Sequence, residues 1–94
     1  MVITKLFDSF AVGRLTLPNR FVMAPLTRCR ADLNTYIPND LMTEYYTQRA
    51  RHAGLVISEF TTVSEGAITF HTEGCIYNEE QALGWKKVVD SVHA

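Results

Sequence analysis

The chain has 94 residues, of which 47% are hydrophobic and 20% are charged, and its formal net charge is −1. These values are typical of one small globular domain, and they argue against disorder, against a basic surface for nucleic acid and against a membrane span. The two cysteines form no disulfide framework, so we expect a cytoplasmic protein. From its charge and its lack of a long apolar stretch we expect no nucleic-acid or membrane partner.

Residues 9–19 are predicted to form a β-hairpin. Two short segments, 9–12 and 15–17, flank Gly13, and glycine suits the positive φ that a tight turn requires. A strand is predicted next, over residues 21–24. Its apolar residues follow one another without interruption, which is typical of a parallel strand covered on both faces.

A polar loop then leads to a helix predicted over residues 40–52. Asn39 or Asp40 can cap its start, and Gly54 can end it. One side of this helix carries, at helical spacing, Leu41, Met42, Tyr45, Tyr46, Ala50 and Ala53. The two tyrosines either pack in the core or contact a ligand.

A second strand is predicted over residues 55–59, followed by a long loop over 61–77 and a helix over 79–92. Asn78 can cap this helix, with Gln81 three residues later as in a capping box. The predicted buried stripe of the helix contains Ala82, Trp85, Val88, Val89 and Val92.

This order of elements predicts an α/β fold in which the two strands are parallel and the first helix is the crossover between them. Ligands of such folds gather beyond the carboxyl ends of the strands. Thr27 lies beyond the first strand, where its hydroxyl either holds a polar ring edge or bonds its own backbone. Glu59 ends the second strand and is either a general base or a buried carboxylate paired with Arg28 or Arg30.

No metal site is expected. Zinc ligands could be drawn only from Cys29, His52, His71 and Cys75, which are too scattered for a closed site and are more simply explained as surface or partly buried side chains.

Several motifs occur in one order across nearly the whole chain. They are Leu6-Phe7 with Leu17-Pro-Asn-Arg20, Met23-Ala-Pro-Leu-Thr-Arg28, Glu44-Tyr-Tyr-x-Gln-Arg-Ala50, Ala53-Gly-Leu-Val-Ile-Ser-Glu59, and Trp85-Lys-Lys87 with Val92-His93. On these motifs the chain resembles the N-terminal part of the old yellow enzyme family of FMN-dependent NADH:flavin oxidoreductases, or ene-reductases.

The resemblance implies an α/β fold, the N-terminal part of a (β/α)8 TIM barrel. Residues 1–94 would then be an incomplete barrel domain, with a hairpin over 9–19 that covers the barrel bottom and two β/α units over 20–54 and 55–94. The complete enzyme would be an oxidoreductase that binds FMN and reduces activated alkenes such as enones with NAD(P)H.

The resemblance also implies roles for individual residues. The first-strand loop that lines the flavin corresponds to Ala24, Pro25, Leu26 and Thr27. The Thr27 hydroxyl would hydrogen-bond the flavin O4 edge and tune its reduction potential. Phe60 matches a flavin-contacting position that is usually Ala or Gly, so its ring needs additional room. Phe70 matches an aromatic residue near the active-site mouth and either gates the substrate or packs the loop.

A complete barrel has eight strands and about 250 residues, whereas only two barrel strands are predicted here. The family's substrate-binding His/Asn or His/His pair and its proton-donating Tyr lie on later strands, so no catalytic residue is assigned. We therefore expect a fragment, a truncated gene product or one chain of a split protein, inactive alone, whose partner is the remainder of the barrel or a second copy. The alternative is a non-catalytic interaction or assembly module.

Overall fold

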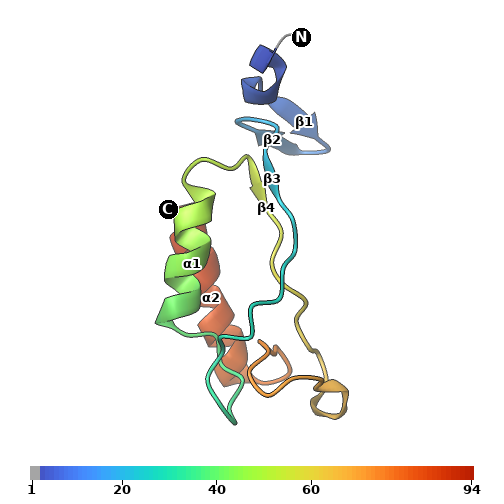
Figure 1. Ribbon diagram of the computed structural model, residues 1–94, viewed down its shortest axis with the longest axis vertical. Coiled ribbons are helices and arrows are strands. Elements are labelled where there is room, and N and C mark those ends of the chain that lie inside the picture. The colour runs from blue at the N-terminus through green and yellow to red at the C-terminus, as the bar shows by residue number, and fades with distance from the viewer. Residues whose placement is uncertain (1–2) are drawn as a thin grey trace.

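The structure, a computed structural model, describes residues 3–94, and its elements follow the predicted order with two 3-10 helices added (Figure 1). In chain order they are η1 (Ile3–Phe7), β1 (Phe10–Val12), β2 (Leu15–Leu17), β3 (Val22–Met23), α1 (Asp40–Ala50), β4 (Leu55–Val56), η2 (Glu65–Ala67) and α2 (Glu79–His93). The strands form two separate two-stranded sheets, and residues 3–94 close no barrel. None of the described helices combines the length and apolar composition needed to cross a membrane.

The predicted hairpin is confirmed. Strands β1 and β2 are antiparallel, and Val12 pairs with Leu15 across the turn. Gly13 has a φ of 58°, a left-handed conformation that costs glycine little because it has no side chain.

Strands β3 and β4 are parallel, as predicted, but they are shorter than the predicted ranges 21–24 and 55–59. Backbone bonds from Gly54 N to Phe21 O (2.8 Å) and from Ile57 N to Met23 O (3.1 Å) bracket the pair. Within residues 3–94, β3 and β4 pair only with each other. Their pairing ends where the loops that follow them diverge.

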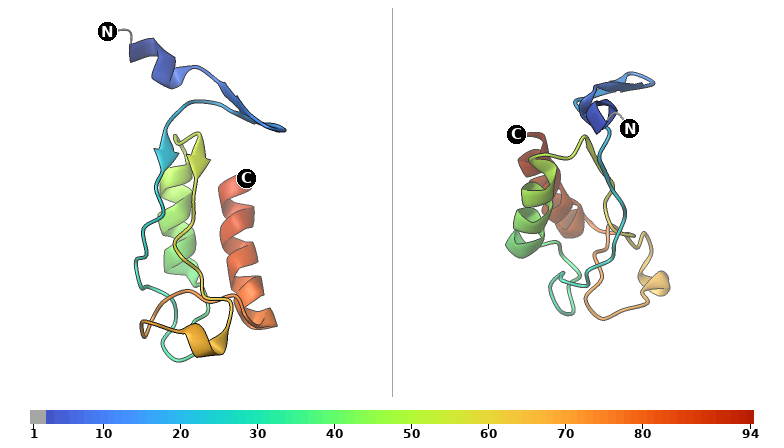
Figure 2. Two further views of the ribbon diagram at one scale, coloured as in Figure 1. Left: turned by 90° about the vertical axis from the view of Figure 1, so that its right-hand side faces the viewer. Right: turned by 45° about the horizontal axis from the view of Figure 1, so that its top comes forward.

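The prediction that residues 21–24 are covered on both faces is wrong. The side chains of Phe21 and Val22 are 42% and 50% exposed. A continuous apolar run indicates that both faces of a strand could be buried, but whether they are buried depends on which other elements pack against them. The helices pack against this small sheet from one side only, so the opposite face is open to solvent (Figure 2).

Gly54 has a different role from the predicted helix cap. Helix α1 ends at Ala50, with Arg51 in a right-handed helical conformation as its C-cap. A Cβ on Gly54 would lie 2.1 Å from the backbone oxygen of Asn19. Glycine is therefore needed here because two backbone segments approach each other closely, where any side chain would overlap.

Asn39, one of the two caps considered for the first helix, and Asn78 are confirmed as N-caps. The side-chain oxygen of Asn39 accepts a hydrogen bond from the amide of Met42 (3.1 Å), and that of Asn78 accepts one from the amide of Gln81 (2.9 Å). Each cap pairs one of the amide groups that a first helical turn leaves without a backbone partner.

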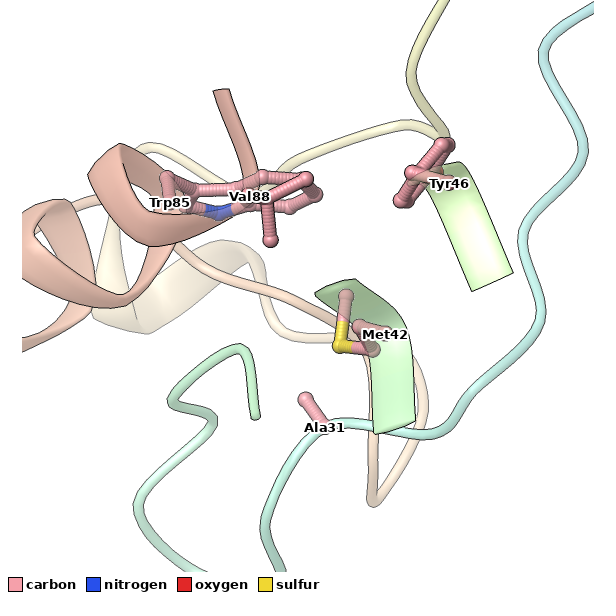
Figure 3. Close-up of a cluster of buried hydrophobic side chains, with 5 residues drawn as sticks. All are labelled: Ala31, Met42, Tyr46, Trp85 and Val88. Atoms are coloured by element: carbon pink, nitrogen blue, oxygen red, sulfur yellow. The ribbon is translucent and has the colours of Figure 1, made fainter. Parts of the chain in front are cut away.

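The hydrophobic core lies between the two helices and the loop after β3, and Figure 3 shows its side chains converging from these segments. Its buried members are Ala31, Met42, Tyr46, Trp85 and Val88. The indole N–H of Trp85 donates to the backbone oxygen of Cys75 (3.1 Å), which satisfies the polar atom of this large side chain. The buried faces are narrower than predicted: Leu41 is 57% exposed and Val89 is 44% exposed.

The hairpin and the long loops lie at opposite ends of the molecule (Figures 1 and 2). Strands β3 and β4 both run from the hairpin end toward the loop end, and helices α1 and α2 lie side by side along them. The segments that follow the two strands therefore share the end of the molecule that is remote from the hairpin.

Candidate functional site

The loop after β3 carries four of the predicted flavin residues. Ala24, Pro25 and Leu26 are exposed, with Leu26 at 50%, and Thr27 is half-buried. The Thr27 hydroxyl takes part in none of the side-chain hydrogen bonds found within residues 3–94, so the bond to its own backbone that we considered is not observed. The loop after β3 therefore presents exposed apolar side chains and a hydroxyl that makes no side-chain hydrogen bond within residues 3–94.

Phe60 and Phe70, two residues that the sequence pointed to separately, are brought together by the structure. Their ring centroids are 6.1 Å apart at an interplanar angle of 74°, an edge-to-face contact. Phe60 is 43% exposed and Phe70 49%. The two rings therefore form a partly solvent-exposed aromatic surface at the loop end of the molecule.

Glu73, which the sequence did not single out, organises the turn that carries Phe70. It is fully buried, and its carboxylate accepts hydrogen bonds from the amides of Thr69 (2.6 Å) and Phe70 and from the hydroxyl of Thr62. Burial alone would raise the pKa of Glu73, but the bonds from Phe70, Thr62 and Thr69 together hold it below its usual value. The sequence contains only a weak signal, a Glu four residues after a Thr in a loop, and this occurs in many exposed turns.

Glu59 and Tyr46 form a second buried polar pair. The Tyr46 hydroxyl donates to Glu59 Oε1 (2.9 Å) and accepts from the Glu59 amide (2.8 Å). Burial raises the pKa of Tyr46 and also that of Glu59, where the Tyr46 hydroxyl and Arg28 offset the effect only in part. Glu59 is thus buried, as one alternative proposed, but its side-chain hydrogen bond goes to Tyr46 of α1, and no ion pair with Arg28 or Arg30 is found within residues 3–94.

The orientation of Glu59 also argues against its role as a general base. Its side chain is 3% exposed and turns toward α1, whereas the next residue, Phe60, is exposed. The buried carboxylate, bonded to Tyr46, is therefore not accessible to a substrate at the exposed aromatic surface. Core packing is confirmed for Tyr46, which is 2% exposed and lies against Trp85 at a centroid distance of 6.3 Å.

A pocket of about 380 Å³ lies between α1 and the loop after β3. It is lined by Arg28, Arg30, Leu41, Met42, Glu44, Tyr45, Gln48, Arg49 and Glu59. The guanidinium of Arg49 stacks over the ring of Tyr45 at 4.1 Å, which supports one wall of the pocket. None of the predicted flavin or substrate residues lines this pocket; in the described chain they form an open surface instead.

No group of three or more His, Cys, Asp or Glu side chains gathers into a possible metal site in the part of the chain that the structure describes. The zinc ligands considered from the sequence stay scattered, and Cys75 is buried.

Comparison with known proteins places this geometry in a family. The model of the NADH:flavin oxidoreductase / NADH oxidase family matches residues 5–94. A Leishmania infantum protein named "Probable flavin mononucleotide-dependent alkene reductase" is 51% identical over 82 residues, which cover 87% of this chain and 22% of that protein. The 12-oxophytodienoate reductase 7 of Oryza sativa subsp. japonica is 49% identical over 90 residues, which cover 95% of this chain and 22% of that protein.

Solved structures agree with this assignment. The old yellow enzyme from Trypanosoma cruzi matches with a TM-score of 0.88 and 44% identity over 95% of this chain and 24% of that one. Morphinone reductase matches with a TM-score of 0.86 and 45% identity over 94% of this chain and 23% of that one. The chain thus spans about a quarter or less of the length of the relatives that it matches.

These matches confirm the resemblance that the motifs indicated, together with FMN and NAD(P)H as the cofactors of the family. The chain belongs to the NADH:flavin oxidoreductase / NADH oxidase family, the FMN-dependent family of the old yellow enzymes.

Proposed function

We propose that this chain forms the first two β/α units of a TIM-barrel oxidoreductase that binds FMN and reduces activated alkenes such as enones with NAD(P)H. Residues 9–19 close the bottom of that barrel, and residues 20–54 and 55–94 form the two units. When bound, FMN would supply the hydride-transfer chemistry between the nicotinamide and the alkene, and the Ala24–Thr27 loop together with Phe60 would hold it. The 94 residues alone are inactive in this proposal, because the barrel around the flavin is built mainly from other strands.

One observation carries the proposal. The parallel pair β3–β4 directs the loops after both strands to the end of the molecule that is remote from the hairpin. The loops after those strands carry exposed apolar residues, the ring of Phe60 and the Thr27 hydroxyl, which makes no side-chain hydrogen bond within residues 3–94. The flavin ring of FMN, the cofactor of the family, is the ligand that we propose for this surface. The surface is open in this chain because the strands that would complete its walls lie outside residues 3–94.

The test uses a full-length barrel that carries this segment. We expect it to purify with bound yellow cofactor. Thr27→Val removes the hydroxyl at constant shape, so FMN binding should weaken about 2- to 10-fold, the range for one hydrogen bond, and the flavin reduction potential should shift. Thr16→Val, on the exposed strand β2 of the hairpin, is the matched control and should leave both unchanged.

Two results would count against these statements separately. A folded full-length protein that contains no flavin contradicts the proposed function. Equal FMN affinity and reduction potential in Thr27→Val and Thr16→Val leave the function in place but remove the role of Thr27.

A second candidate function, an assembly module, is favoured by the strand edges. Strands β3 and β4 each pair with one neighbour, and exposed apolar side chains such as Phe21 and Val22 flank them. The remainder of a barrel or a second copy could cover these edges. Size-exclusion chromatography discriminates: a stable flavin-free monomer of the 94 residues favours a free-standing module, whereas aggregation that is rescued by the remaining strands favours the barrel.

A further inference from the structure

The turn formed by residues 69–73 is held by a buried carboxylate. Glu73 Oε1 accepts from the amides of Thr69 and Phe70, and Oε2 accepts from the hydroxyl of Thr62. Thr62 in turn forms a parallel bridge with Cys75. A single side chain therefore joins the loop that leaves β4 to the turn that follows η2.

The same turn is also tied to the loop after β3. The Thr72 hydroxyl donates to the backbone oxygen of Cys29 (2.8 Å), and the Ala31 amide donates to the backbone oxygen of Thr72 (3.0 Å). The turn thus bridges the two loops that begin with the predicted flavin residues. Its position relative to those loops is set by hydrogen bonds on both sides.

Phe70 is the residue whose position depends most directly on this arrangement. Its amide is bonded to Glu73, and its ring meets the edge of Phe60 while remaining half-exposed. A half-exposed ring has little packing of its own to hold it in place. The backbone anchor therefore decides where the ring lies, and the ring of Phe60 supplies its contact.

We propose that Glu73 is a positioning residue that holds Phe70 against Phe60, so that the two rings form one aromatic wall beside the flavin and select alkenes with flat, apolar substituents. This inference rests on the proposed function and adds to it the residues that set substrate preference. Glu73 does not touch the substrate; it acts through the backbone of Phe70.

The test measures KM and kcat of the full-length flavoenzyme with a flat apolar enone and with a bulky polar one. Glu73→Ala should raise KM for the flat enone about 2- to 10-fold, the range for losing an aromatic contact, with a smaller change in kcat. Phe70→Leu should have the same effect. Glu73→Gln should move KM less than Glu73→Ala, because its amide oxygen can still accept from both backbone amides and its nitrogen can donate to Thr62.

A double-mutant cycle separates positioning from general destabilisation. If Glu73 acts through Phe70, the double variant Glu73→Ala/Phe70→Leu should be no worse than Phe70→Leu alone. Hydrogen exchange provides a readout that does not depend on turnover: the Phe70 amide should lose protection in Glu73→Ala. Ser64→Ala, an exposed change in the same loop, is the control and should leave KM and this protection unchanged.

The proposal would be overturned if the effects of Glu73→Ala and Phe70→Leu on KM were additive, or if Glu73→Ala left the hydrogen-exchange protection of the Phe70 amide unchanged. If Glu73→Ala does not fold, Thr62→Val removes one bond of the same carboxylate, and its cycle with Phe70→Leu carries the same criterion. Absence of flavin from the unmodified full-length protein refutes the proposed function. Bound flavin with normal turnover but no KM change in Phe70→Leu refutes only the aromatic wall.

Discussion

Replacing Tyr46 by phenylalanine is the sharpest test of the polar pair beneath the candidate site. The ring of Tyr46 is 2% exposed and remains in place in the variant, so packing is preserved. The change removes one hydroxyl, which is both a donor to Glu59 Oε1 (2.9 Å) and an acceptor from the Glu59 amide (2.8 Å). Because Glu59 Oε2 already has no hydrogen-bond partner among the described residues, both carboxylate oxygens would then be buried without a hydrogen bond from residues 3–94.

The expected cost follows from these two bonds. A hydrogen bond to a charged group contributes about 1.5–3 kcal/mol, and a neutral one about 0.5–1.5 kcal/mol. Tyr46→Phe should therefore lower the free energy of unfolding by about 2–4 kcal/mol. The pKa of Glu59 should rise further, because burial already raises it and the Tyr46 hydroxyl is among the groups that restrain the rise.

Urea unfolding of the full-length protein measures the free energy, hydrogen exchange measures protection of the Glu59 amide, and carbon NMR of the carboxyl measures its pKa. Tyr45→Phe is the matched control, since this neighbouring hydroxyl makes none of the hydrogen bonds found in residues 3–94. If Tyr46→Phe costs no more than Tyr45→Phe, or if protection of the Glu59 amide is unchanged, the two bonds do not stabilise the end of β4 and the reasoning is wrong.

Three further predictions concern the fold around the site. Gly54→Ala places a methyl group 2.1 Å from a backbone oxygen and should lower the free energy of unfolding by about 3 kcal/mol or more, measured by thermal unfolding. Gly66→Ala is the control, because its methyl group would lie in open space and should be close to neutral. Equal Tm values for the two variants would contradict the close approach at Gly54. Asn78→Ala removes the N-cap of α2 and should cost about 1 kcal/mol in urea, with Ser64→Ala as the control because that N-cap residue makes no side-chain cap bond. Folding lowers the pKa of Glu73, so the stability that Glu73 contributes is present above about pH 4.5 and is lost as the pH falls through its folded-state pKa. Glu73→Gln should therefore weaken the dependence of the free energy of unfolding on pH at acid pH. An unchanged dependence would refute the lowered pKa of Glu73.

Local features were accessible from the sequence. Asn39 and Asn78 cap their helices as predicted, and Gly13 forms the hairpin turn, because each depends on groups within a few residues of itself. The strand–helix–strand–helix order was readable for the same reason, as periodicity and turn residues act over short stretches. The motifs also identified the family, because a motif is recognised from the types and order of residues along the chain and needs no knowledge of contacts.

The tertiary structure decided the partners of the buried polar groups. The side chain of Glu59 bonds Tyr46, 13 residues away, and forms no ion pair with Arg28 or Arg30 within residues 3–94, because α1 packs over the end of β4 and covers the carboxylate. Glu73 was not recognisable, since its importance comes from the return of the chain to Thr62. Burial likewise depends on neighbours that are distant in sequence: one apolar pattern cannot distinguish a strand covered on both faces from β3, which has helices on one face only.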